Sequence, residues 1–194
     1  KRHGGIVDAL RCIEKSLPFR LSTVKFDSGS EFMNYEVVNS LRRHGEGTRA
    51  KPITIYRSRP YRKNDNCYVE QKNLTHVRQF IGYDRIENQN ATRLLNELYR
   101  DLWCPFLNFF MPTFKLIKKE RIGSRIKKTY EKPRTPYERI LASAAVTDEA
   151  KEALRLRYES LDPIELKYSI EEKLKLLMRI IREEKQSEEL KLAA

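Results

Sequence analysis

Residues 57–78 read RSRPYRKNDNCYVEQKNLTHVR and join a basic segment, a turn and the start of a helix. Residues 57–63 hold four cations and no acid, and Pro60 breaks regular structure there, so we expect an exposed loop. The next three residues favour turns and helix N-caps through their side chains; they are Asn64, Asp65 and Asn66. A helix is therefore predicted to begin at about this point, directly after a loop that attracts polyanions.

This predicted helix carries Glu70 in its first turns, close to the positive end of the helix dipole. Helical spacing predicts its buried side, made by Val69, Val77, Phe80 and Ile81. An acid at this position has two interpretations. It is a common stabilising choice at a helix start, or it belongs to a functional site next to the basic loop.

A second acid, Asp27, lies where a short strand is expected to end. Residues 21–26 alternate apolar and polar side chains, as a half-buried strand does, and FDSGSEFMN at 26–34 continues into a turn and a helix. Carboxylates at the carboxyl ends of strands in open α/β sheets point into the ligand crevice. Asp27 and Glu70 are therefore candidates to share a divalent metal ion.

These motifs resemble the integrase core of bacterial insertion-sequence transposases, the group that includes retroviral-type integrases and has a ribonuclease-H-like fold. The resemblance is carried by FDSGSEFMN (26–34) and SRPYRKNDNCYVEQKN (58–73). It continues in chain order through VRQFIGYDR (77–85), LNELY (95–99), NFFMPTFKL (108–116) and TPYERIL (135–141). It covers residues from about 6 to 141, and the turn after Asp27 reads Ser28-Gly29 where the family usually has Asn-Gly.

The resemblance implies a catalytic triad of two Asp and one Glu that holds two magnesium (or manganese) ions. Asp27 matches the second acid and Glu70 the third, so both are expected to be catalytic and to bind metal. The first acid has no counterpart in this sequence. The residues themselves predict only two strands, 21–26 and 52–56. The sheet that the resemblance implies has five strands, so we expect the chain to begin inside a domain and to form part of a ribonuclease-H-like α/β fold.

Positive charge is concentrated in two segments of this 194-residue chain, whose net charge is +12. Residues 49–63 hold six cations and no acid, and residues 114–139 hold ten cations and three acids. Clustered cations suit a polyphosphate partner, so we expect DNA. The expected DNA-binding residues are Arg57, Arg59, Arg62, Lys63, Lys72, Lys118, Lys119, Arg121, Arg125, Lys127 and Lys128.

The remaining pattern predicts helices over residues 6–17, 31–44 and 87–107, with Pro105 ending or kinking the third. The dense aromatic residues after it are expected to pack rather than to stack on bases; they are Trp103, Phe106, Phe109, Phe110 and Phe114. Residues 115–136 are expected to form an extended arm or loose hairpin along DNA. Two helices should follow: one capped by Thr147, and a last one that starts at Asp162-Pro163 with proline at an early position.

These patterns give three expected parts: residues 1–113, the end of an integrase catalytic core; 114–136, the basic arm; and 137–194, a helical region for packing or protein contacts. No apolar run reaches the ~18 residues of a membrane span. Cys12, Cys67 and Cys104 lack metal-ligand spacing, which argues against a disulfide framework or a zinc site. We expect a cytoplasmic, DNA-associated bacterial protein without membrane partners.

Three functions remain open from the sequence. The first is DNA transposition: a DNA-binding transposase fragment whose full-length form cuts and joins strands, acts on transposon ends and target DNA, and self-associates. The alternative is a catalytically inactive truncated transposase that only binds nucleic acid or another protein. The third is a basic nucleic-acid-associated protein whose acids are only structural.

Overall fold

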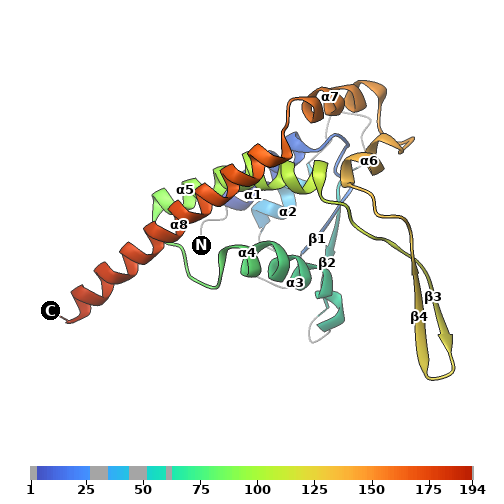
Figure 1. The fold of residues 1–194 in the computed structure, drawn as a ribbon. Helices are drawn as coiled ribbons and strands as arrows, with labels where there is room; N and C mark the ends of the chain where they lie inside the picture. The colour runs from blue at the N-terminus through green and yellow to red at the C-terminus, as the bar shows by residue number, and fades with distance from the viewer. Residues whose placement is uncertain (1–3, 27–34, 44–51, 60–62, 194) are drawn as a thin grey trace. The chain divides into compact units, whose positions relative to one another are not determined.

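The computed structural model describes residues 4–26, 35–43, 52–59 and 63–193 (Figure 1). The chain divides into two compact units. The first unit spans Lys1–Tyr83 and the second Asp84–Ala194. This division falls at a different place from the boundaries at 113/114 and 136/137 expected from the sequence. Each unit is described by itself.

The first unit contains a parallel pair of strands with two helices. Helix α1 (Gly4–Ser16) precedes strand β1 (Thr23–Phe26), and helix α2 (Tyr35–Arg42) lies in the chain between β1 and strand β2 (Thr54–Arg57). The two strands pair in register from Thr23 opposite Thr54 to Phe26 opposite Arg57. The predicted helix at 6–17 and both predicted strands are confirmed within one or two residues of their ends.

A small core holds this unit together. The buried side chains are Phe26 from β1, Val37 and Leu41 from α2, and Ile53 just before β2. Apolar side chains of α1 pack against them, including Leu10. Because consecutive strand residues face opposite sides, a four-residue strand contributes few side chains to this core, and the helices supply much of the rest.

A helical run follows the basic loop, as predicted, but its buried side differs from the prediction. The run comprises a 3-10 turn η1 (Lys63–Asp65), α3 (Cys67–Asn73), a π-helical segment η2 (Leu74–Arg78) and α4 (Gln79–Ile81). Ile81 is buried and Phe80 half-buried, while Val69 and Val77 are exposed. The prediction for Val69 and Val77 is wrong because helical spacing identifies an apolar stripe without supplying a neighbour to cover it.

The expected cap of this helix also differs. Asn66 occupies the N-cap position with helical dihedral angles, φ −99° and ψ −2°, and makes no side-chain capping bond to any described residue. A capping side chain usually extends from a β-region backbone. Here the 3-10 turn leads directly into α3, so Asn66 is already wound into the helix.

The second unit begins with a long helical segment that passes through Pro105. It comprises α5 (Gln89–Glu97), capped by Asn88, and the π-helical segments η3 (Leu98–Trp103) and η4 (Phe106–Phe110). Pro105 has no N–H, so the usual bond to the carbonyl four residues earlier cannot form. The wider π-helical turns on both sides carry the helical path onward. We expected Pro105 either to end or to kink the helix, and the prediction that the helix ends there is wrong.

Residues 116–130 form a two-stranded antiparallel hairpin, which confirms that part of the expectation for the basic arm. Strand β3 (Leu116–Ile122) pairs with strand β4 (Arg125–Tyr130), with an irregular register at Ile117. Gly123 adopts φ +61° at the tip, a left-handed conformation that glycine accepts without strain. All hairpin side chains except that of Glu120 are exposed.

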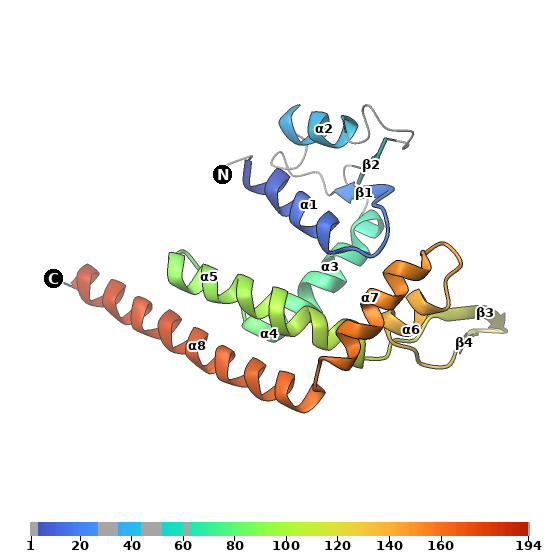
Figure 2. The same ribbon diagram turned by 90° about the horizontal axis from the view of Figure 1, so that it is seen from above.

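Three helices complete this unit: α6 (Pro136–Leu141), α7 (Asp148–Glu159) and α8 (Pro163–Ala193). Thr135 and Glu138 form a capping box at α6, and the predicted cap by Thr147 is confirmed. The predicted start of the last helix at Asp162-Pro163 is also confirmed, and the Asp162 side chain caps it. Helix α8 lies antiparallel beside α5 (Figure 2). Among the described residues, no helix is both long and apolar enough to cross a membrane.

Helix α8 packs against α5 and η3 through apolar side chains, with ion pairs beside them. Leu98 and Leu177 are fully buried, and Lys173 Nζ lies 3.2 Å from Glu97 Oε2. Farther along, Lys185 Nζ lies 2.6 Å from Asp84 Oδ1. Of the two roles left open for the C-terminal helices, the structure shows packing within the unit.

Aromatic packing joins η4 to α6 and α7. Phe109 is buried, with its ring centroid 5.2 Å from that of Tyr137, and Tyr137 stacks on Tyr158 at 4.8 Å. This confirms the predicted packing role for most of the cluster. Phe114 is an exception, since it is exposed and meets Tyr130 edge-on at the base of the hairpin.

Candidate functional site

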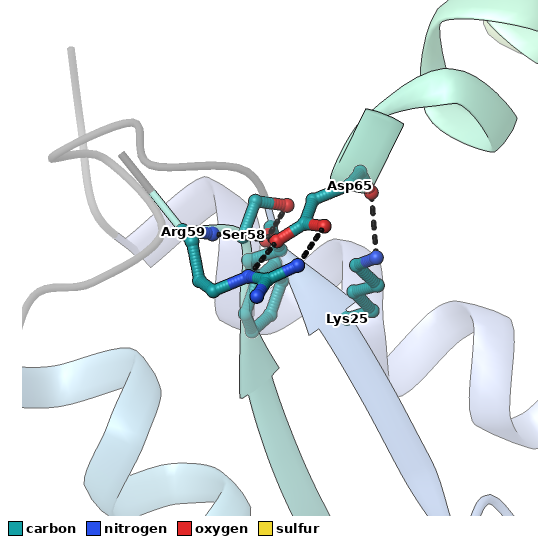
Figure 3. A network of polar contacts seen from close by, with 5 residues as sticks. Lys25, Ser58, Arg59 and Asp65 are labelled. Atoms are coloured by element: carbon teal, nitrogen blue, oxygen red, sulfur yellow. Dashed lines mark hydrogen bonds and ion pairs between the residues drawn. The ribbon is translucent and has the colours of Figure 1, made fainter. Parts of the chain in front are cut away.

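The carboxyl ends of β1 and β2 lie side by side in the first unit. Phe26 pairs with Arg57, and the backbone N–H of Ser58 donates to the Phe26 carbonyl at 3.1 Å. The Ser58 hydroxyl donates to the same carbonyl at 3.2 Å, and this side chain is almost fully buried (Figure 3). The residue before Asp27 is thus joined to the residues that lead out of β2 into the basic loop.

A second contact joins β1 to the turn that precedes α3. The Lys25 ammonium donates to the Asp65 backbone carbonyl at 2.5 Å (Figure 3). Asp65 closes the 3-10 turn from which the chain enters α3, the helix that carries Glu70. Residues 40 positions apart in the sequence therefore meet at the carboxyl end of the strand pair.

Asp65 is engaged by Arg59 through a two-point contact. Arg59 Nε lies 2.8 Å from Asp65 Oδ2, Arg59 Nη2 lies 3.0 Å from Oδ1, and the Arg59 backbone N–H also donates to Oδ2 at 3.1 Å. These bonds favour the charged carboxylate and hold the pKa of Asp65 well below its usual range. The same contact raises the pKa of the Arg59 guanidinium. Asp65 thereby compensates one of the cations of the loop.

The other predicted residues of this region are placed as follows. Glu70 is exposed on α3, Arg57 is exposed at the end of β2, and Lys63 begins the 3-10 turn. Asp27 and Arg62 lie outside the described residues. The proximity of Asp27 to Glu70 therefore stays a prediction.

Lys72 is exposed on α3, one turn from His76. Its ammonium Nζ is 3.3 Å from His76 Nε2. Partial burial, with the Lys72 charge in addition, lowers the pKa of His76. His76 therefore favours its neutral form at neutral pH.

The described residues supply part of the expected metal site. Glu70 offers the carboxylate oxygens that magnesium prefers, and its exposure leaves them accessible. Asp65, the nearest described acid before it in the sequence, has both carboxylate oxygens bonded to Arg59. Within the described ranges no three His, Cys, Asp or Glu residues gather in a metal-binding group. The Glu70 carboxylate is of the type that magnesium binds, and its pairing with Asp27 stays a prediction.

The hairpin of the second unit holds the other expected DNA-binding cations. Lys118, Lys119 and Arg121 lie on β3, and all three are exposed. The three on β4 are also exposed; they are Arg125, Lys127 and Lys128. Lys118 Nζ pairs with Glu120 Oε1 at 2.6 Å. The remaining charges are presented to solvent along a narrow ribbon.

Sequence reasoning missed the roles of Lys25, Ser58 and Asp65. Lys25 appeared only as the polar member of an alternating strand, and Asp65 as a turn former. The one available signal was the acid that follows the basic loop, because Arg and Asp six residues apart on two sides of a turn can meet. Ser58 gave no signal, since its role depends on the register between two strands.

Comparisons with known proteins find a protein of similar sequence but do not assign the chain to a family. A protein of Sinorhizobium fredii (strain NBRC 101917 / NGR234), described as "Uncharacterized protein y4rM", is 41% identical over 139 residues. The aligned region is 72% of this chain and 37% of that protein, so the shared segment spans little more than a third of the relative's length. No family model matches the chain, and no solved structure matches it.

Proposed function

We propose that this chain contributes the later part of an integrase-type catalytic core, with a partial ribonuclease-H-like fold, to metal-dependent DNA transposition. In this proposal Asp27 and Glu70 are two of the three catalytic acids. The reaction of the whole protein is cleavage of DNA and transfer of the cut strand to a target. The support comes from the strand ends of the first unit together with the sequence resemblance.

One observation carries the proposal: the contact between Lys25 and Asp65. It ties the end of β1, one residue before Phe26, to the turn that opens α3. Asp27 follows Phe26 directly in the sequence, and Glu70 lies in the first turns of α3. The end of β1 and the turn before α3 are therefore adjacent at the carboxyl end of a parallel strand pair, where α/β proteins bind ligands. This supports the proposal because each acid follows one of these two segments in the sequence.

The chain's own residues have three roles in this proposal. The carboxylates of Asp27 and Glu70 hold the metal, the exposed cations beside them bind DNA phosphates, and Arg59 with Asp65 fixes the direction of the loop. Bound magnesium would stabilise the negative charge that develops at phosphorus. Arg57 is exposed at the end of β2, within the same edge of the strand pair, and so suits a phosphate contact.

The exposed cations of the hairpin favour a second candidate, a protein that binds DNA without cutting it. That function needs Lys119 and its neighbours and does not need Glu70. Metal binding at Asp27 and Glu70 separates the two candidates.

The test uses Mn²⁺ as a paramagnetic probe of the purified chain. We expect millimolar Mn²⁺ to broaden the NMR signals of Asp27 and Glu70 together, and each of Asp27→Asn and Glu70→Gln to remove the broadening at both positions. Glu120→Gln is the matched control, because Glu120 is an acid of the other unit and should leave the broadening unchanged. Broadening at Glu70 that persists in Asp27→Asn would contradict the proposal. With two of three acids present, we expect no magnesium-dependent strand transfer by this chain alone.

A further inference from the structure

The hairpin of β3 and β4 has two chemically different faces. In an antiparallel pair, residues directly opposite each other share a face, and successive residues alternate between faces. The register places Lys119 opposite Lys128 and Arg121 opposite Ile126 on one face, here called the acid-free face. These four residues include three cations and no acid.

The opposite face carries the one acid of the two strands. Glu120 lies opposite Lys127, and Lys118 on the same face pairs with Glu120 at 2.6 Å. Two of this face's cations therefore have a carboxylate beside them. On the acid-free face, in contrast, no described acid forms an ion pair with Lys119, Arg121 or Lys128.

The like charges on the acid-free face destabilise the hairpin when no ligand is bound. Like charges directly opposite each other destabilise a strand pair, and a two-stranded ribbon is marginally stable in water. Lys119 and Lys128 are such a pair, and both are exposed. A phosphate between the two ammonium groups would turn this repulsion into attraction.

The base of the hairpin is fixed to the rest of its unit. The Arg139 side chain on α6 forms an ion pair with Glu131, just after β4, and donates to the Thr113 carbonyl, just before β3, at 2.7 Å. The Thr113 N–H also bonds the Arg134 carbonyl at 2.9 Å across the base. The ribbon is thus held at one end while its charged length is exposed.

We propose that the acid-free face of this hairpin, with Lys119, Arg121 and Lys128, enters the major groove of duplex DNA and contacts the phosphates that border it. A two-stranded ribbon fits the major groove of B-form DNA, whereas the deep and narrow major groove of duplex RNA excludes side chains. This inference rests on the proposed function, in which DNA is the partner. It adds which surface of the chain binds the DNA and that the DNA is a B-form duplex.

The experiment compares two double variants with equal loss of charge in the full chain. Fluorescence anisotropy measures the Kd for one labelled DNA duplex of about 20 base pairs, long enough to expose two major-groove turns, at several salt concentrations. We expect Lys119→Ala with Lys128→Ala to weaken binding about tenfold or more, and to reduce the salt slope by about two. Lys118→Ala with Lys127→Ala, the matched control, should weaken binding less than about threefold.

The variants should fold, since removing Lys119 and Lys128 relieves a repulsion; the NMR spectrum of residues 116–130 checks this. Equal losses in the two double variants would overturn the choice of face, and equally tight, lysine-dependent binding of duplex RNA would overturn the major-groove assignment. Either result leaves the metal site of the proposed function standing. Failure of the intact chain to bind duplex DNA would overturn this inference and the proposed DNA function together.

Discussion

The two basic segments of this chain look alike in sequence and differ in structure. In the first, Arg59 is bonded at two points to Asp65, and the pair sits where two strands end. In the second, Lys119 faces Lys128 across a hairpin, with no described acid between them. The number of cations in a stretch of sequence therefore does not predict how many of them remain unpaired and able to contact a partner.

The difference has a physical cause. In the first segment, the 3-10 turn at Lys63–Asp65 places the Asp65 carboxylate beside Arg59, which precedes it in the chain. In the second segment the chain reverses only at the tip of the hairpin, so along the two strands an acid reaches only its neighbours on one face of the ribbon. The first arrangement pairs a basic side chain with an acid, and the second leaves its cations exposed to solvent.

The largest expected effect comes from separating the hairpin from its support. Arg139→Met removes the contacts to Glu131 and to the Thr113 carbonyl, in a place where both charged side chains are mostly buried. We expect the second unit to lose about 1–3 kcal/mol of stability, because the remaining polar groups lose their partners. Urea unfolding and amide exchange of residues 116–130 measure this loss.

Arg155→Met is the matched control, since its ion pair with Glu152 is exposed on one helix. It should change stability little. Equal destabilisation by the two variants would show that Arg139 has no special role at the base of the hairpin.

A smaller effect on stability is expected from Asp65→Asn. This substitution removes the carboxylate that pairs with Arg59, so the first segment, like the hairpin, has a cation without an acid beside it. Because the folded-state pKa of Asp65 is lowered, the carboxylate stabilises the fold above the ordinary carboxyl pKa of about 4. That stability is lost as pH falls below this value toward the lowered pKa. The stability difference between the original chain and Asp65→Asn should therefore shrink from pH 6 to pH 3.

Unfolding of the first unit at each pH gives this difference. Asp8→Asn is the control, because the Asp8 pair with Arg11 is exposed on both sides. A difference for Asp65→Asn that stays constant with pH would contradict the role given to its charge.

The smallest expected effect tests the repulsion on the acid-free face. Lys128→Thr removes one of two like charges that lie opposite each other, so the hairpin should gain about 0.2–1 kcal/mol. Lys127→Thr makes the same chemical change opposite Glu120 and should shift stability the other way. Amide exchange in β3 measures the stability of the hairpin in both variants. Greater hairpin stability in both would show that threonine's preference for strands outweighs the effect of the charges.

Much of the secondary structure was predictable because its signals are local. The period of apolar residues in 6–17, the alternation in 21–26, the cap at Thr147 and the helix start at Asp162-Pro163 each depend on a few neighbouring residues. The exposure of Val69 and Val77 was not predictable in this way, since burial requires a second element to cover the stripe. The prediction that the helix ends at Pro105 failed for a related reason. A helix can continue past a missing N–H by widening its turns, and the local sequence does not show this.

The candidate site divides along the same line. The sequence by itself determined which residue types are available: the acids Asp27 and Glu70, the basic loop and the cations of the hairpin. Only the tertiary structure decided that Lys25 meets the turn before α3, that Asp65 belongs to Arg59, and that Lys119 faces Lys128. Composition fixes the charges and the local preferences, but the pairing of charges depends on distances of a few ångströms, and these are set by strand register and chain reversal.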